Sequence, residues 1–250
     1  MKIILAILSL AFIIGHAKGT KIEDFPVNAP NVDADRNKGN KFKEVIENFK
    51  DILRNGNETF GIPAMDPYKS DPLKLSYKSD KFRGKLNIES VDVFGTSNYV
   101  VNKAAFKMVG LKMCLGLRWN KLRGDINAYN FNGILFNLTD VYGKGNAEFT
   151  IRDFDVFTSV FLKINPATKK LAIKHIDTQF SLGSFQFYSE GIYNDRDISQ
   201  VVSAIISDMA PKFIQMYQKE LTDVVKEILT DFGNEFLSRK TLKDLLDLIS

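Results

Sequence analysis

The sequence predicts an α+β fold in which a short N-terminal helix precedes a large antiparallel sheet and a long C-terminal helix. Apolar residues recur every three or four positions from Lys41 to Arg54, which is the spacing of one helix face. They alternate with polar residues from Leu73 onward and return to helical spacing after Asp197. Because helices and strands are segregated along the chain, we expect the sheet to lay its apolar face on the C-terminal helix.

A stiff connector separates the first helix from the sheet. "NGN" at 55–57 ends the helix, and "GIPAMDP" at 61–67 follows it. Proline fixes φ, lacks an N–H donor and pushes the preceding residue out of the α region. The heptad can therefore continue neither a helix nor a central strand, and we interpret it as the link between the two.

Long strands joined by short turns follow, and this favours an antiparallel meander over βαβ units. Turn signals at Gly110, Gly124, Gly143 and Gly183 divide the strand-like segments. Beyond the short alternating runs at 73–75, 86–88 and 91–93, the predicted strands are 98–109, 111–122, 125–138, 145–164 and 170–188.

Alternation assigns the two faces of these strands. Lys112, Cys114 and Arg118 share one face of the strand at 111–122. The other face is apolar, and neighbouring strands extend it, which gives Leu111, Met113, Leu115, Leu117, Trp119, Ile134, Phe136, Leu138, Phe149 and Ile151. The sheet therefore has one large, continuous and partly aromatic face.

The C-terminal segment predicts one long amphipathic helix from Val201 to Ile228, kinked or restarted near Pro211. A shorter helix is expected at 236–249. Neither an internal repeat nor a linker divides the chain, so we expect residues 20–250 to form a single domain and to act as a monomer.

The first nineteen residues have the pattern of a secretory signal peptide. Lys2 precedes an apolar run at 3–14, and the small residues Ala17 and Gly19 follow it. This run is short of the roughly 20 residues that span a bilayer. We expect cleavage after Gly19 and an extracellular protein, in which the sequons at Asn57 and Asn137 can carry N-glycans. Asn57 is favoured, because Asn137 falls on a predicted strand.

Composition argues against several classes of function. The formal charge is only +4 and the charged residues are interspersed, so nucleic acid has no basic footprint to bind. Cys114 is the single cysteine, which excludes an intramolecular disulfide. Without the signal peptide, His175 is the only histidine, and no HExxH, CxxC, GxSxG or P-loop pattern occurs. Asp153 and Asp155 fit a solvated strand face, so we expect neither an enzyme nor a cofactor or metal site.

Apolar side chains are abundant instead, with 20 phenylalanines in the chain. They fit either a packed core or the wall of a cavity for an apolar ligand. The residue pattern leaves these two alternatives open.

The connector and three later stretches of the sequence resemble those of a known protein family. "FGIPAMDP" at 60–67 resembles the "GIPxxDP" segment of the insect takeout and juvenile-hormone-binding-protein family, and the stretches at 86–101, 133–151 and 185–213 are also similar to that family. The resemblance implies a tubular lipid-binding fold, with a strongly curved sheet around a long helix, and a secreted carrier of juvenile hormone or another lipophilic molecule. Family members usually have a cysteine pair ahead of this motif, whereas residues 20–60 have none. We therefore expect Phe42, Ile46 and Phe49 to anchor the first helix by packing alone.

Under this interpretation a small hydrophobic ligand lies between sheet and helix. The predicted wall residues are Met113, Leu115, Leu117, Trp119, Ile134, Phe136, Phe149, Ile151, Met209, Phe213, Tyr217 and Leu221. Trp119 and Tyr217 bring hydrogen-bond donors for a polar ligand head. The alternative is a secreted protein whose surface binds a membrane or a protein partner such as a receptor, and an exposed apolar patch rimmed by lysines would favour it.

Overall fold

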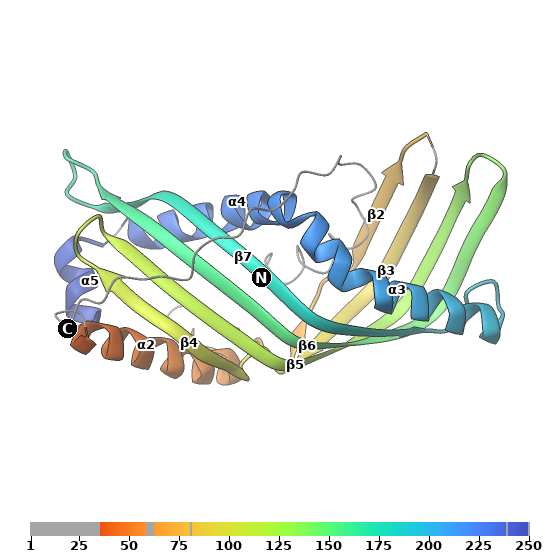
Figure 1. Cartoon of the computed structure of the whole chain (residues 1–250), viewed down its shortest axis with the longest axis horizontal. Coiled ribbons are helices and arrows are strands. Elements are labelled where there is room, and N and C mark those ends of the chain that lie inside the picture. Colours follow the sequence, from red (N-terminus) through yellow and green to blue (C-terminus); the bar gives the residue numbers. More distant parts are fainter. Residues whose placement is uncertain (1–35, 59–62, 81, 239, 250) are drawn as a thin grey trace.

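The computed structural model describes residues 36–58, 63–80, 82–238 and 240–249, so the predicted signal peptide lies outside the described residues. The elements are α2 (Arg36–Asn55), β1 (Tyr68–Lys69), β2 (Leu73–Lys78), β3 (Phe82–Phe94), β4 (Tyr99–Lys107), β5 (Lys112–Leu135), β6 (Thr139–Ile164), β7 (Leu171–Ser189), α3 (Arg196–Met216), α4 (Gln218–Leu237) and α5 (Leu242–Ile249). The order helix, sheet, helix agrees with the prediction, and Figure 1 shows how the helices flank the sheet.

One antiparallel sheet of seven strands organises the molecule. Its order is β1-β3-β5-β6-β7, with β2 paired to β3 and β4 paired to β5. The two longest strands, β5 and β6, have 24 and 26 residues and run through the whole sheet. β3 pairs with one half of β5 and β4 with the other, so the sheet has two ends that share these central strands (Figure 1).

Three glycines that the sequence places at turns lie inside strands. Gly124, Gly143 and Gly183 belong to β5, β6 and β7, which run on without interruption. A Cβ on Gly124 would lie 2.0 Å from Cζ of Phe149, and one on Gly143 would lie 3.0 Å from the Tyr129 hydroxyl. These glycines make room for neighbouring groups inside the sheet. From the sequence alone, such a glycine cannot be told from one that forms a turn.

The long C-terminal helix, expected to be kinked or restarted near Pro211, is two helices, α3 and α4, which meet at Tyr217. Pro211 lies inside α3, and the break comes after it at a residue with φ −108° and ψ 25°. Both helices contact the curved strand β7, and the change of direction lets them follow it (Figure 1).

Serines of α3, in place of a further strand, satisfy the open edge of β7. An unpaired strand edge carries N–H and C=O groups that need partners. Hydroxyls spaced four residues apart accept hydrogen bonds from backbone N–H groups: Ser207 from Phe187 (2.9 Å), Ser203 from Ser189 (3.0 Å) and Ser199 from Ile192 (3.0 Å). This polar side of α3 therefore faces the sheet edge.

The side chains of α4 continue the same pairing along β7. Thr222 donates to the carbonyl of Thr178 (2.9 Å), and Asn234 accepts from the N–H of Ile173 (2.7 Å). With its amide nitrogen toward the Phe180 carbonyl, Gln218 pairs with both backbone groups of that residue. The two helices thus act as the missing neighbour of β7.

Replacing Ser203 with alanine is expected to lower the free energy of unfolding by about 1–3 kcal/mol, because the N–H of Ser189 is left buried without a partner. Ser203 is 3% exposed, and its hydroxyl also contacts the Ser189 hydroxyl at 3.1 Å. Urea unfolding monitored by circular dichroism gives the value. The control Gln200→Ala, on the exposed side of α3, should change stability by less than about 0.5 kcal/mol. Equal effects of the two changes would contradict this role for the serine.

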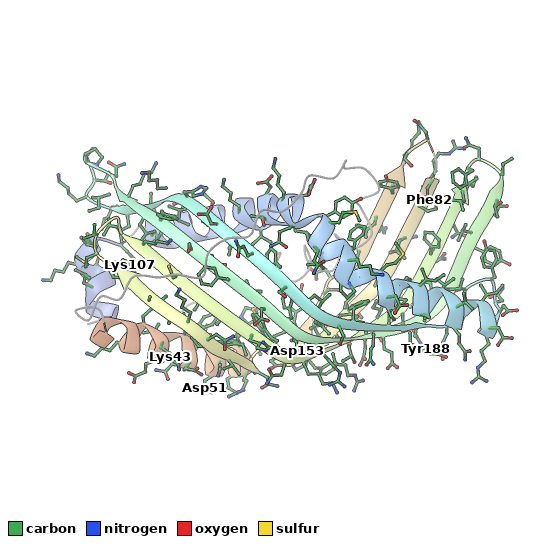
Figure 2. The ribbon with its side chains drawn as sticks, viewed as in Figure 1. Lys43, Asp51, Phe82, Lys107, Asp153 and Tyr188 are labelled. Carbon is green, nitrogen blue, oxygen red and sulfur yellow. The ribbon has the colours of Figure 1, made fainter. Side chains whose placement is uncertain are left out.

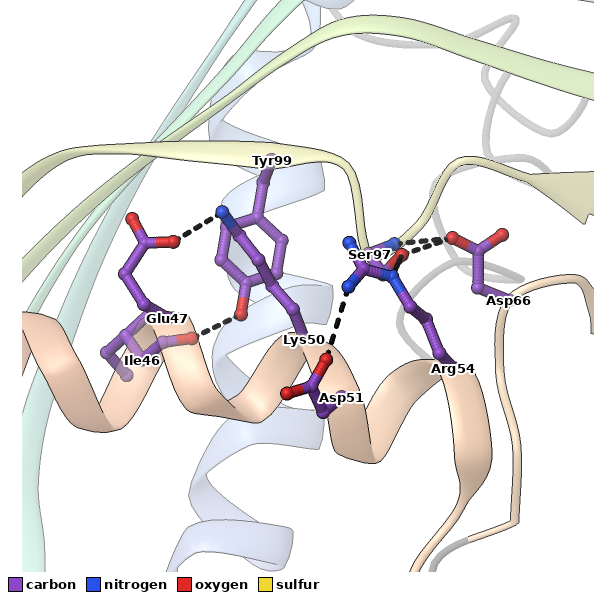
Figure 3. Close-up of polar contacts among 8 residues, drawn as sticks. All are labelled: Ile46, Glu47, Lys50, Asp51, Arg54, Asp66, Ser97 and Tyr99. Atoms are coloured by element: carbon purple, nitrogen blue, oxygen red, sulfur yellow. Dashed lines mark hydrogen bonds and ion pairs between the residues drawn. The ribbon is translucent and has the colours of Figure 1, made fainter.

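Hydrogen bonds as well as packing hold α2 on the sheet (Figure 3). The Tyr99 hydroxyl donates to the carbonyl of Ile46 (2.5 Å), and Arg54 donates through Nε to Ser97 Oγ (3.1 Å). Burial and then the nearby Glu47 carboxylate raise the pKa of Tyr99 to about 12, so its hydroxyl keeps its proton. Phe42 is buried as predicted, whereas Phe49 is 38% exposed, and packing alone is therefore not the anchor.

Asp66 of the connector joins the chain after α2 to the turn between β3 and β4. Its carboxylate accepts from the N–H of Gly95 (2.7 Å) and from the N–H (3.0 Å) and hydroxyl (2.5 Å) of Ser97. The N–H groups of Met65 and Asp66 donate to the carbonyl of Leu53, at the end of α2. The described part of the connector therefore fastens helix, turn and sheet at one point (Figure 3).

This arrangement predicts a pH-dependent contribution to stability. Burial alone would raise the pKa of Asp66, but the hydrogen bonds from Ser97 and Gly95 outweigh it and the pKa is lowered. The contribution is thus present above the pKa of the unfolded chain, near 3.8, and is lost as the pH falls through the lower folded value. We expect Asp66→Asn to cost about 1–2 kcal/mol at about pH 7 and much less at about pH 3. Urea unfolding at both pH values tests this, and an equal cost at both would contradict it.

Candidate functional site

The helices cover one face of the sheet, here called the inner face, and three clusters of buried residues lie on it, of which the smallest contains Leu86, Tyr129 and Ala147. The central cluster contains Tyr68, Val91, Val93, Phe149, Ile151, Phe154, Phe180, Ile214, Leu221 and Val225. The end cluster contains Phe42, Phe106, Leu162, Leu171, Ile173, Ile176, Leu237 and Leu245. Since the end cluster draws on α2, α4 and α5, these three helices close the inner face at that end (Figure 1).

A strip of half-buried residues separates the central and end clusters along β5. Met113 packs on the end cluster and Trp119 on the central cluster, six residues apart and therefore about 20 Å in an extended strand. Leu115 and Leu117 lie between them, belong to neither cluster and are only half-buried. Together with Thr158, which is paired with Leu115, we call them the inner strip. Its leucines are apolar side chains on the core side of the sheet that are only half-buried, and on the helix side Leu229 of α4 packs against both clusters.

Two threonine hydroxyls on the inner face were missed by sequence reasoning. Thr158 of the strip is paired with Thr178 of β7, and their hydroxyl oxygens lie 3.3 Å apart. Thr178 is 4% exposed, while Thr158 is half-buried. The apolar face therefore carries one polar position midway along its length. Threonine is common in strands and gives no sequence signal of such a role.

Most of the predicted wall residues lie on the inner face, but several of them are buried in the packed core and do not line an open space. Phe149, Ile151 and Leu221 are 3%, 8% and 3% exposed within the central cluster. Their side chains therefore form the packed core at one end of the inner strip, whereas the sequence predicts that they contact a ligand.

Trp119 and Tyr217, the two residues predicted to donate a hydrogen bond to a polar ligand head, differ in whether that donor is free. Trp119 donates through Nε1 to the carbonyl of Thr96 (2.9 Å), so its N–H is already used. Tyr217 is 7% exposed, and Phe213 packs against it with ring centroids 4.4 Å apart. Among the described residues, no group makes a hydrogen bond with the Tyr217 hydroxyl. Tyr217 is therefore the better candidate of the two.

Three predicted wall residues lie away from the inner face. Phe136 is in the β5–β6 turn, with φ 51° and 57% exposure, so the expected strand ends before it. Ile134 shares the outer face with Asn132 and is 37% exposed. Met209 is 56% exposed on α3, where the serine side of the helix takes the contact with the sheet. For Phe136 the expected alternation runs past the end of β5, whereas Ile134 lies within β5 and follows a register shift between Ile126 and Tyr129.

A hollow of about 710 Å³ lies on the outer face near Ile134, between β2, β3, β5 and β6. Charged residues Lys78, Arg83, Lys85 and Asp140 line it together with Asn132 and Tyr142. Its position on the outer face separates it from the interior between sheet and helices, where the sequence predicts the ligand.

The carboxylates of Asp153 and Asp155, the thiol of Cys114 and the imidazole of His175 all have partners in the structure. Arg118 pairs with Asp153 (2.7 Å) and Asp155 (3.5 Å) on an exposed part of the sheet. Cys114 is buried beside the hydroxyl of Ser159 (3.6 Å), whereas His175 contacts Asp177 (2.5 Å). Across the described residues, no group of three His, Cys, Asp or Glu side chains could hold a metal ion, and no helix is long and apolar enough to cross a membrane.

The elongated antiparallel sheet with helices along its inner face is a mixed α/β fold that matches the Takeout-like tubular fold. The crystal structure of Epiphyas postvittana Takeout 1 is similar with a TM-score of 0.58 and 11% sequence identity, over 82% of this chain and 93% of that chain. A crystal structure of a lipopolysaccharide binding protein has a TM-score of 0.40 and 10% identity, over 81% of this chain and 40% of that chain.

Sequence comparison supplies the family. Residues 5–247 match the family described as haemolymph juvenile hormone binding protein (JHBP), and the chain belongs to that family. No curated protein matches it by sequence.

Proposed function

We propose that this protein is a secreted carrier that encloses one elongated apolar ligand over the inner strip. The observation that carries the proposal is the half-burial of Leu115 and Leu117, between two packed clusters on the core side of the sheet. Family membership supports the same function, since the matching family is named for binding a hormone. The proposed function is binding and transport, without catalysis.

The geometry favours a narrow ligand with one polar group. The flanking clusters limit it to about 20 Å along β5, and α2 and α4 lie along β4 and β7 on either side. Apolar contacts supply the affinity, at about 25 cal/mol per Å² of buried area before ordering costs. The hydroxyls of Thr158 and Tyr217 are the candidate partners of the polar group. A terpenoid related to juvenile hormone or a fatty acid meets these requirements.

The single tryptophan offers a direct test of ligand binding. Trp119 is the only tryptophan in the chain, and it lies two residues from Leu117 on the same face. We expect titration with oleic acid or farnesol to shift its fluorescence saturably, with little response to their short, soluble counterparts acetate and ethanol. Absence of a saturable shift with every long apolar compound tried would contradict the carrier function.

Secretion and glycosylation belong to the same proposal. Asn137 lies in the exposed β5–β6 turn with φ 57°, and not on a strand as predicted. The preference for Asn57 over Asn137 is therefore wrong. We therefore propose both Asn57 and Asn137 as glycan acceptors. A glycan at Asn137 would shield Phe136 and Leu138, which are 57% and 87% exposed. Intact mass before and after enzymatic deglycosylation, with N-terminal sequencing for the start at Thr20, tests both parts.

A further inference from the structure

The end of the molecule opposite the Asn137 turn exposes apolar side chains that no sequon can cover. At the tip of the β4–β5 hairpin, Val109 is 93% exposed and Met108 is 37% exposed. Ile164, where β6 enters its hairpin with β7, is 40% exposed. These two hairpins lie at the same end of the sheet (Figure 1), and the N–H of Leu162 donates to the carbonyl of Leu111 (2.9 Å) between them. An exposed valine at a tip contributes nothing to the packing of the fold.

The same two hairpins are basic and contain no carboxylate. Residues 99–124 and 156–176 include no Asp or Glu, in a chain that has 30 of them. The lysines nearest the tips are Lys107, Lys112, Lys163 and Lys169. Figure 2 shows Lys107 at this end, and Lys112 lies over the ring of Phe161 at 4.7 Å.

Charges on the neighbouring elements do not neutralise this surface. In α2, Lys41 and Lys43 outnumber Glu44, whereas in α5 Asp244 and Asp247 outnumber Lys243, so these charges of the two helices sum to zero. Asp244 interacts with Lys170, next to Lys169, and leaves the other hairpin lysines without an acidic counterpart in their own hairpins. Asp177 of β7 contacts His175. The end that carries Val109 therefore keeps a net positive charge.

We propose that this end, defined by Met108, Val109, Lys107, Lys163 and Lys169, docks on membranes that contain anionic phospholipids. Apolar side chains at a tip can enter the boundary between headgroups and acyl chains, while lysines beside them attract lipid phosphates and carboxylates. Charge complementarity selects this partner, because an acid-free basic rim around an apolar tip fits an anionic bilayer surface. The opposite tip, with Phe136 and Leu138, has a sequon and the carboxylates Asp80 and Asp140 close to it. Docking does not depend on a bound cargo.

The test is flotation of the purified protein with protein-free vesicles of phosphatidylcholine, with or without phosphatidylserine. We expect binding to the anionic vesicles that weakens with added salt, and little binding to phosphatidylcholine alone. Replacing Lys107, Lys163 and Lys169 with glutamine should weaken vesicle binding roughly fivefold per lysine. Met108→Ser with Val109→Ser should weaken it at least about tenfold, although such exposed positions leave folding intact.

Matched changes at the other end are the controls. Phe136→Ser with Leu138→Ser, and Lys78→Gln with Lys85→Gln, should leave vesicle binding unchanged. Failure of the native protein to float with anionic vesicles would overturn the proposal, and so would equal losses from changes at the two ends. Binding that requires cells and is absent from protein-free vesicles would point to a receptor and would also overturn it. Because fluorescence of Trp119 reads ligand binding separately, a negative result here leaves the carrier function standing.

Discussion

Replacing Leu117 with tryptophan is expected to abolish uptake of a long apolar ligand while the protein stays folded. Leu117 is half-buried on the inner face, paired with Val101 on one side and Val156 on the other. Under the proposed function, an indole at this position would take the place of the ligand over the inner strip. We expect affinity for oleic acid or farnesol to fall at least about a hundredfold, because the ligand loses its apolar contact area there. Isothermal titration calorimetry measures the affinity.

The same substitution on the other side of the sheet serves as the control. Val100 is 46% exposed on the outer face of β4, so Val100→Trp should leave ligand affinity unchanged. Thermal unfolding of both variants separates a filled site from a damaged core. If Leu117→Trp unfolds the protein, the strip is part of a solid core, since overpacking a closed interior costs about 1–3 kcal/mol or more. Unchanged affinity in a folded variant would place the ligand elsewhere.

A large loss of stability is expected from Gly124→Ala. The added Cβ would lie 2.0 Å from Cζ and 2.2 Å from Cε1 of Phe149, which is 3% exposed in the central cluster. The ring has to leave its place, at a cost of about 2–3 kcal/mol in the free energy of unfolding. Gly116→Ala in the same strand is the control, because its Cβ meets Lys103 Cβ at 3.2 Å and the cost should be smaller.

A double-mutant cycle with Phe149→Leu tests the cause. If the steric conflict is between these two residues, the double variant should be more stable than the sum of the single effects predicts, by at least about 1 kcal/mol. Additive effects would show that Gly124 matters for another reason, such as strand geometry. Urea unfolding of the four proteins supplies the values.

The periodicity of the sequence was enough to predict the order of the elements but not their breaks. The helix at 41–54 and the antiparallel sheet are both present, because a spacing of 3.6 or 2 follows directly from burying one side of an element. The helix break at Tyr217 depends on the path of β7, which is set by the rest of the sheet. Ser199, Ser203 and Ser207 were overlooked, since their role as partners of a strand edge appears only once that edge is known.

The sequence predicted which face of the sheet carries the candidate site better than it predicted which residues line it. Leu115, Leu117 and Trp119 were assigned to the correct face, because alternation holds along a strand until its register shifts, and this part of β5 has no shift. Phe136 was assigned to the wrong surroundings because the sequence does not show where the β5–β6 turn begins. Ile134 lies within β5 but after a register shift between Ile126 and Tyr129, which local alternation does not reveal. Which apolar residues fill a cluster and which stay half-buried depends on the distance between facing elements, and no local pattern encodes that distance.

Native mass spectrometry of the protein secreted by eukaryotic cells, followed by organic extraction, tests the central claim most directly. The carrier function predicts adducts of a few hundred daltons that vanish on denaturation and reappear in the extract as an elongated apolar compound, a mass range set by the length of about 20 Å between the clusters. A bare protein mass, together with no uptake of added oleic acid or farnesol, would contradict it.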